Sequence, residues 1–127
     1  MKYVYAQDIQ DRMVEIVRLL KMNHVDLNRV KCFRGIGSKA RGVIARCHAL
    51  GKLMQKAMGV EAFYAIEFLA RFDKLSKEEQ DKVIIHELMH VPKSFGGGFR
   101  HHDYVEERNV DILYEMYLRI KGSLNKF

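Results

Sequence analysis

The feature that most constrains the fold is a segment over residues 76–92 that carries strong helix signals at both ends. It begins with Ser76-Lys77-Glu78-Glu79, a capping box in which the serine hydroxyl and the Glu79 carboxylate bond each other's backbone N–H groups. It ends before Pro92, the only proline of the chain, which cannot continue a helix and disfavours helical geometry in its predecessor. The sequence therefore predicts a helix from Ser76 to Val91.

This predicted helix contains the motif His86-Glu87-Leu88-Met89-His90. Residues four apart on a helix lie one turn apart on the same face, so the two imidazoles can bind one zinc ion. Glu87 is offset by one residue and can flank the metal, taking a proton from the attacking water and returning it to the leaving amine. We predict His86 and His90 as zinc ligands and Glu87 as the catalytic base. The alternative is a structural pair of histidines.

A catalytic zinc site needs a third protein ligand and leaves a fourth position to water. Metzincins place the third histidine six residues after the second, and Gly96 at that position excludes their pattern. The remaining candidates follow the glycine loop over residues 96–98. His102 is favoured because it precedes the expected start of a helix, which would hold a ligand more rigidly than a loop. The alternatives are His101 and the carboxylates Asp103, Glu106 and Glu107.

The rest of the sequence predicts an α+β fold in a single domain over residues 1–127. Apolar residues at helical spacing predict an amphipathic first helix over residues 7–22. Alternation around residues 30–34, turn glycines and an apolar arm over 43–50 predict a β-hairpin. A short helix ending at Gly59, a strand over residues 62–70 and a last helix from Asp103 to about Gly122 complete a small sheet of three to four strands with its helices.

The strand within residues 63–70 is expected to lie at the sheet edge, beside the helix that carries the histidines. An extended peptide could add to such an edge as a further strand. The alternative is a fully covered core strand.

Composition indicates a globular protein that folds without disulfides. The chain has 127 residues, of which 48% are hydrophobic, and this is enough to bury a core. No apolar run approaches the roughly 18–20 residues of a membrane span, and polar residues interrupt the start where a signal peptide is apolar. Cys32 and Cys47 form neither a CxxC pair nor a disulfide framework. We therefore expect a cytoplasmic protein with reduced thiols.

The net charge of +6 is concentrated in one part of the chain. No Asp or Glu occurs from Leu27 to Val60, and that segment carries a charge of +8. Such a segment can bind phosphate or another polyanion, although Phe33 is the only aromatic residue there that could stack on a base. Weak nucleic-acid contact is thus an alternative, through Arg29, Lys31, Arg34, Lys39, Arg41 and Arg46.

The stretch HELMHVPKSFGGGFRHHD and the order of elements around it resemble a family of small archaeal and phage-borne zinc metallopeptidases. These are similar in turn to the SprT-like and minigluzincin zincins. The specific part is HELxH-[IV]-P followed by a glycine loop and Arg-x-His-Asp, here Arg100, His102 and Asp103. The resemblance implies His102 as the third ligand. It also implies a minimal zincin-like domain with one catalytic Zn²⁺ that hydrolyses peptide bonds of a peptide or protein substrate.

Two other functions stay open as alternatives. A metal-dependent endoribonuclease of the YbeY type also arranges three histidines after a helix and would explain the basic segment. Its motif has no glutamate after the first histidine, so Glu87 argues against it. A non-catalytic zinc-stabilised domain could instead bind nucleic acid through the basic residues 29–56. A filled fourth coordination position would favour that domain over an enzyme.

Overall fold

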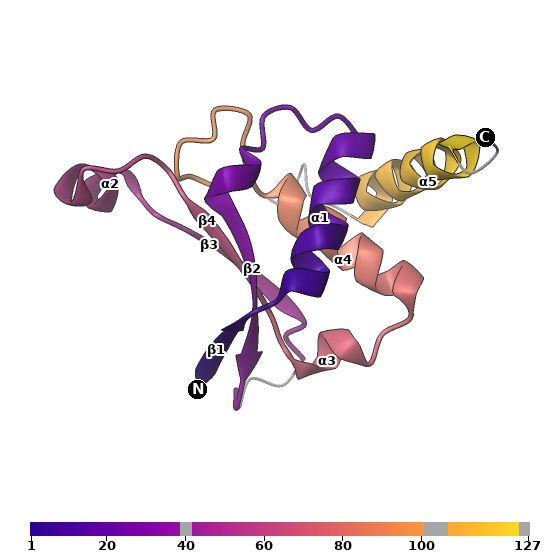
Figure 1. The fold of residues 1–127 in the computed structure, drawn as a ribbon, viewed down its shortest axis with the longest axis horizontal. Helices are drawn as coiled ribbons and strands as arrows, with labels where there is room; N and C mark the ends of the chain where they lie inside the picture. The colour runs from indigo at the N-terminus through magenta and orange to yellow at the C-terminus, as the bar shows by residue number, and fades with distance from the viewer. Residues whose placement is uncertain (39–41, 101–106, 125–127) are drawn as a thin grey trace.

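The computed structural model describes residues 1–38, 42–100 and 107–124. The four strands lie within the first 68 residues, and the described elements after them are the helices α3, α4 and α5 (Figure 1). In chain order the elements are β1 (Lys2–Tyr5), α1 (Gln7–Leu19), the 3₁₀ turn η1 (Leu27–Arg29), β2 (Val30–Ile36), β3 (Ala45–Ala49), α2 (Lys52–Met58), β4 (Tyr64–Phe68), α3 (Ala70–Asp73), α4 (Lys77–Met89) and α5 (Glu107–Leu124).

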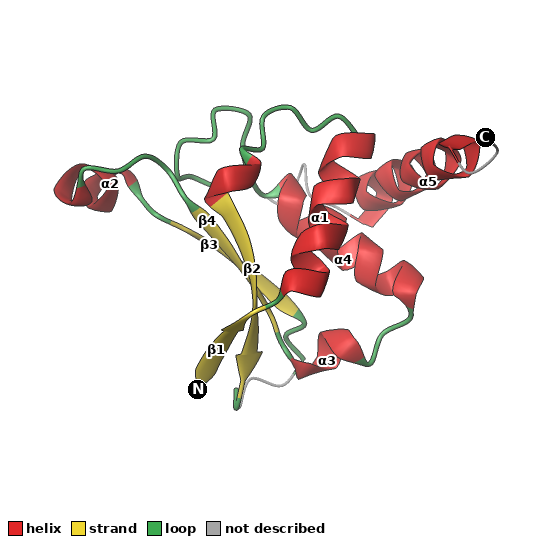
Figure 2. Cartoon of the chain, in the orientation of Figure 1, coloured by secondary structure: helices red, strands yellow, loops and turns green. Residues whose placement is uncertain are grey.

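The four strands form one mixed sheet in the order β1-β2-β4-β3. β2 and β4 are parallel, whereas β1 and β3 pair antiparallel with their neighbours. Helices α1 and α4 lie on one side of the sheet, and α5 packs against both of them (Figure 2). The expected α+β class with a small sheet is thereby confirmed.

The expected hairpin between residues 30–34 and 43–50 is wrong, because β4 lies between β2 and β3 and pairs with both. The reason is burial: Tyr64, Ile66 and Phe68 on one face of β4 are at most 1% exposed, and Glu67 on the other face is 3% exposed. A strand that is buried on both faces takes a central position in a sheet. The strand over 63–70 is consequently not the sheet edge. The edge beside α4 is β3, and the other edge is β1.

Helix α1 follows the periodicity of its sequence. Ile9, Met13, Ile16 and Val17 recur at helical spacing and are at most 4% exposed. They pack in one core with residues of β2, β4 and α4. Full burial of an aliphatic side chain contributes about 1.5–3 kcal/mol, so this face is a main reason why the helix docks on the sheet.

Helix α4 begins as predicted and ends slightly early. Ser76 is its N-cap, and the serine hydroxyl accepts a hydrogen bond from the Glu79 N–H at 3.2 Å. The last helical residue is Met89 and the C-cap is His90, two residues before Pro92. The apolar side of α4 is fully buried in the core, and the helix is therefore held in one orientation; its buried residues include Ile84, Ile85 and Leu88.

Helix α5 confirms the expected last helix, whose predicted start at Asp103 lies outside the described residues. Val110, Tyr114 and Tyr117 face the core. No described helix is long and apolar enough to span a bilayer. Cys32 and Cys47 are free thiols, and burial raises the pKa of each to about 12.

Candidate metal centre

His86 and His90 direct their rings toward the same point, one turn apart on α4. Their Nε2 atoms lie 3.2 Å apart, and the ring planes are inclined by 76°. Two nitrogens that each lie about 2.05 Å from a tetrahedral metal ion are separated by about 3.3 Å. The pair therefore has the spacing that one shared ion requires, and both rings are half-buried.

The orientation of the His90 ring is set by the backbone of Arg100. His90 Nδ1 lies 3.1 Å from the Arg100 carbonyl oxygen. A carbonyl only accepts, so Nδ1 carries the proton and donates it, which leaves the lone pair on Nε2 directed toward His86. The Arg100 N–H donates in return to the His90 carbonyl at 2.7 Å. In metal-binding histidines, the ring nitrogen that does not face the metal commonly donates a hydrogen bond to a backbone carbonyl, as it does here.

The glycine loop that leads to Arg100 is held from the sheet side by Tyr64 of β4. The Tyr64 hydroxyl donates to the Gly98 carbonyl at 2.8 Å and accepts from the Gly97 N–H at 2.9 Å. The Tyr64 ring packs edge-on against Phe95 and Phe99. The loop is thus fixed both by hydrogen bonds and by aromatic packing.

The same loop is held from its other side by α2. Gln55 donates from Nε2 to the Gly96 carbonyl at 3.0 Å and to the Leu50 carbonyl at 2.7 Å. Gly97 has φ +99°, and a Cβ there would come within 2.6 Å of the Leu50 carbonyl oxygen, so only glycine fits. Sequence reasoning missed Tyr64 and Gln55, because both act on loop backbone and leave no pattern of residue types.

Glu87 is 6% exposed and lies next in sequence to His86 on the same helix. Burial raises the pKa of the Glu87 carboxyl to about 7. A cation bound beside this carboxylate would lower that pKa again, because an opposite charge favours the ionised form.

His86 and Glu87 line a cleft of about 690 Å³, which we call the metal cleft. It lies between α4, the start of α5 and the residues that lead into the edge strand β3. Its walls are mixed: the residues near the strand are apolar, whereas α4 and α5 contribute both charged and apolar side chains. The lining also includes Gly42, Val43, Ile44, Ala45, Leu75, Glu79, Lys82, Val83, Glu107, Val110 and Asp111.

The predicted third ligand, His102, lies outside the described residues, as do His101, Asp103 and Glu106. Glu107 is described and lines the metal cleft together with His86 and Glu87. Across residues 1–38, 42–100 and 107–124, no group of three or more His, Cys, Asp or Glu side chains is placed to hold a metal ion. Within these ranges the candidate centre consists of the two histidines alone.

Three basic residues of the segment over residues 27–60 pair with carboxylates in the folded chain: Arg29, Arg34 and Arg46. Arg34 bonds the carboxylates of both Asp8 and Asp73, at 2.7 and 2.8 Å. Arg46 pairs with Glu67 at 3.1 Å.

Arg29 also pairs with carboxylates, those of Asp26 and Glu61. Lys39 and Arg41 lie outside the described residues. All the paired carboxylates come from outside the segment, which a count along the sequence cannot show. Of the predicted contact residues, Arg29, Arg34 and Arg46 are paired with carboxylates and Lys31 forms no ion pair among the described residues, so nucleic-acid contact is not supported.

A comparison with protein-family models matches residues 1–121 to the family described as "Putative phage metallopeptidase". Neither a curated protein nor a solved structure matches the chain. The family match reaches from β1 into the last turns of α5, so it covers the whole arrangement that carries the histidine pair. It confirms the resemblance to phage-borne metallopeptidases, and the family name implies a metal-dependent peptidase. The chain therefore belongs to the putative phage metallopeptidase family.

Proposed function

We propose that this protein is a zinc-dependent peptidase that hydrolyses peptide bonds of a peptide or protein substrate. His86 and His90 are two of the zinc ligands, and Glu87 is the catalytic base. The observation that carries the proposal is the 3.2 Å separation of the two Nε2 atoms, with the His90 lone pair oriented by the Arg100 carbonyl. Membership of a metallopeptidase family supports the same reading.

The donor atoms favour zinc over the common alternatives. Imidazole nitrogens suit Zn²⁺, whereas Ca²⁺ and Mg²⁺ take carboxylate, carbonyl and water oxygens. We propose His102 as the third ligand, because it stands in the Arg-x-His-Asp part of the motif that the chain shares with the family. Glu107 is the alternative, since it lines the metal cleft and a glutamate can complete a site with two histidines.

A zinc ion held by these residues would supply Lewis-acid chemistry, polarising the substrate carbonyl and lowering the pKa of a water. The Glu87 carboxylate accepts the proton of the attacking water and later delivers it to the nitrogen of the leaving amine. Apolar residues of the metal cleft, which include Ile44 and Val110, lower the local polarity, and this strengthens the electrostatic interactions at the reacting groups.

The edge strand β3 offers a place for the substrate. It pairs with β4 on one side and has no strand on its other side among the described residues. Because an extended peptide can add to such an edge through backbone hydrogen bonds, we place the substrate along Ala45–Ala49. Residues 44 and 45 line the metal cleft, so a peptide held there would pass beside Glu87.

The proposal is tested by measuring zinc content and hydrolysis on the same preparations. Protein purified without chelator or added metal is expected to carry about one zinc per chain and to cleave an unfolded protein such as casein. Glu87→Gln should keep the zinc and lose about 10²–10⁴-fold in rate, the usual contribution of a general acid–base residue. His86→Ala should lose both the zinc and the activity.

Wild-type protein without stoichiometric zinc would overturn the proposal, as would unchanged hydrolysis by Glu87→Gln. An RNA substrate run in parallel separates the peptidase from the ribonuclease alternative.

A further inference from the structure

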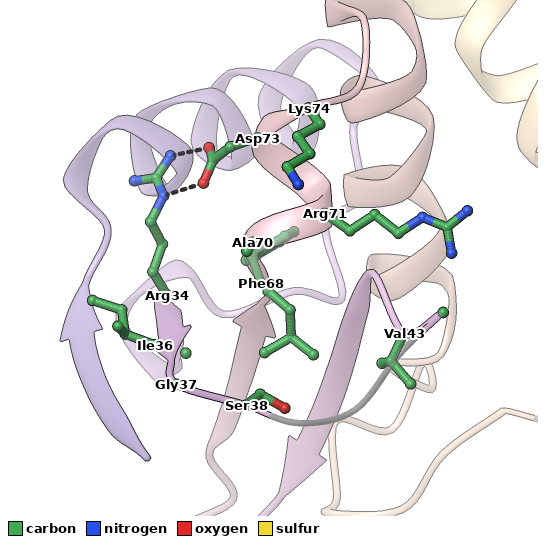
Figure 3. Close-up of a pocket in the computed structure, with 13 residues that line it drawn as sticks. Arg34, Ile36, Gly37, Ser38, Val43, Phe68, Ala70, Arg71, Asp73 and Lys74 are labelled. Carbon is green, nitrogen blue, oxygen red and sulfur yellow. Dashed lines mark hydrogen bonds and ion pairs between the residues drawn. The ribbon is translucent and has the colours of Figure 1, made fainter.

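A second cavity, of about 580 Å³, shares lining residues with the metal cleft. Figure 3 shows this second cavity. Gly42 and Val43 line both cavities, so they form the junction between them. We call the second one the α3 cavity, because Ala70, Arg71, Asp73 and Lys74 of the α3 region form one of its walls. Because the two cavities share lining residues, the α3 cavity continues the metal cleft.

The wall opposite α3 comes from the end of β2 and contains Gly35 and Gly37, which place no side chain in the space. Gly42 has φ +83°, and the position that a Cβ would take there lies 3.8 Å from Nη1 of Arg71. The Arg71 guanidinium therefore lies over the junction of the two cavities.

Two cationic side chains that line the α3 cavity are not paired with a carboxylate in the described part of the chain. Arg34 is bonded to Asp8 and Asp73 and is already neutralised, as the dashed lines to Asp73 in Figure 3 show. Arg71 and Lys74 are exposed, and within the described part of the chain neither forms an ion pair with a carboxylate. Arg71 of α3 and Lys74, the residue that caps its end, lie at the rim of the cavity (Figure 3). The cavity can therefore attract a negatively charged group.

The direction of β3 decides which part of a substrate would reach this cavity. β3 begins at Ala45, just after the junction, and runs away from it. A peptide that adds antiparallel to β3, the more stable way to pair, has its carboxyl-terminal part at the Ala45 end. Substrate residues on the carboxyl side of the cleaved bond would then pass Val43 and reach Arg71.

We propose that the α3 cavity binds a carboxylate of the substrate on the carboxyl side of the cleaved bond, recognised by Arg71 and Lys74. This inference rests on the proposed peptidase function and names its substrate class. An Asp or Glu side chain and a free chain terminus share the required chemistry. Glu79 and Glu107 line the metal cleft, so they would repel an acidic substrate residue next to the cleaved bond. The preference for a substrate carboxylate therefore depends on its distance from that bond.

The test uses neutral peptides of one length in which a single Asp moves through every position, each made with a free and with an amidated C-terminus. Wild-type protein should show about a tenfold higher kcat/KM, mainly through KM, when a carboxylate lies a few residues beyond the cleaved bond. Arg71→Gln with Lys74→Gln should abolish this preference, and Arg71→Glu with Lys74→Glu should reverse it toward a lysine. Preference for free over amidated peptides would identify the chain terminus as the source.

The matched control is Lys56→Gln on α2, which lies at the other end of the sheet from α3 (Figure 1). It should keep the wild-type preference. Cleavage that ignores the position of the Asp would overturn this inference and leave the peptidase function standing.

If no peptide is cut, the peptidase proposal fails, and the binding of labelled peptides to the zinc-loaded protein still tests the cavity. Equal affinity for acidic and neutral peptides would overturn it.

Discussion

His90 and Arg100 hold each other through two hydrogen bonds, one from the Arg100 N–H to the His90 carbonyl and one from His90 Nδ1 to the Arg100 carbonyl. The loop between them contains three consecutive glycines. The orientation of the metal-facing imidazole therefore depends on how a glycine loop closes. The residues that hold this loop should affect metal binding although they do not touch the metal.

Tyr64→Phe is expected to weaken zinc binding about tenfold, the lower end of the effect of removing support from a metal ligand. The change removes the hydroxyl that bridges Gly97 and Gly98 and leaves the ring packing in place. Competition with a chromophoric chelator measures the zinc affinity. The matched control is Tyr117→Phe, which removes a buried-ring hydroxyl bonded to Glu15 and should leave zinc affinity unchanged. An equal loss in both variants would show that the effect is general destabilisation.

Gly97→Ala is expected to lower the free energy of unfolding by about 1–3 kcal/mol and to reduce zinc affinity. The residue has φ +99°, and a Cβ would collide with the Leu50 carbonyl oxygen. Gly98→Ala is the control, because a Cβ at Gly98 would meet nothing within 4 Å. Urea denaturation measures both variants, and a Gly98→Ala variant as unstable as Gly97→Ala would contradict the assigned role of Gly97.

Asp8→Asn is expected to make the free energy of unfolding less dependent on pH in the acidic range. The hydrogen bond from Arg34 lowers the pKa of Asp8 below its usual 3.8, so the folded state binds this proton less readily than the unfolded state. The stabilisation is present above about pH 4 and is lost as pH falls through the lowered pKa.

The Asp8 carboxylate is mostly exposed, so the difference from wild type at pH 7 should stay below about 1 kcal/mol and shrink at low pH. Denaturation curves between pH 2 and 7 measure it. Asp11→Asn, on the same helix, is the control, because Asp11 accepts only from Gln7 in the described structure. A difference that grows on acidification would contradict the argument.

Features that depend on neighbouring residues could be predicted from the sequence. The Ser76 cap, the end of α4 before Pro92 and the end of α2 at Gly59 are confirmed. Each is decided within one turn of chain by capping bonds or by backbone freedom. The helical face of α1 was predicted because its burial repeats with the period of the helix.

Features that depend on distant residues could not be predicted in the same way. Strand order depends on which strand is buried most. Because β4 lies between β2 and β3, these two strands do not form the expected hairpin. β1 was missed because all four of its residues are exposed, so no burial alternation marks it. The charge of residues 27–60 was counted without Asp8, Glu61, Glu67 and Asp73, which reach it only in the folded chain.

Removal of the metal should destabilise the wild-type protein. An ion that binds only the folded state stabilises it by about 2.7 kcal/mol when its free concentration is 100 times Kd. Tm measured with and without a chelator should therefore fall in wild type and in Glu87→Gln, and should not change in His86→Ala or His90→Ala. A fall of equal size in the histidine variants would place the stabilising ion elsewhere.

The most direct measurement is an anomalous-scattering map of protein crystals at the zinc absorption edge. The account predicts one peak at about 2.0–2.1 Å from Nε2 of both His86 and His90, with a third protein ligand at a similar distance. The same map identifies that ligand as His102 or Glu107. A structure in which the two imidazoles bond each other directly and no peak lies between them, in crystals grown with zinc, would contradict the central claim.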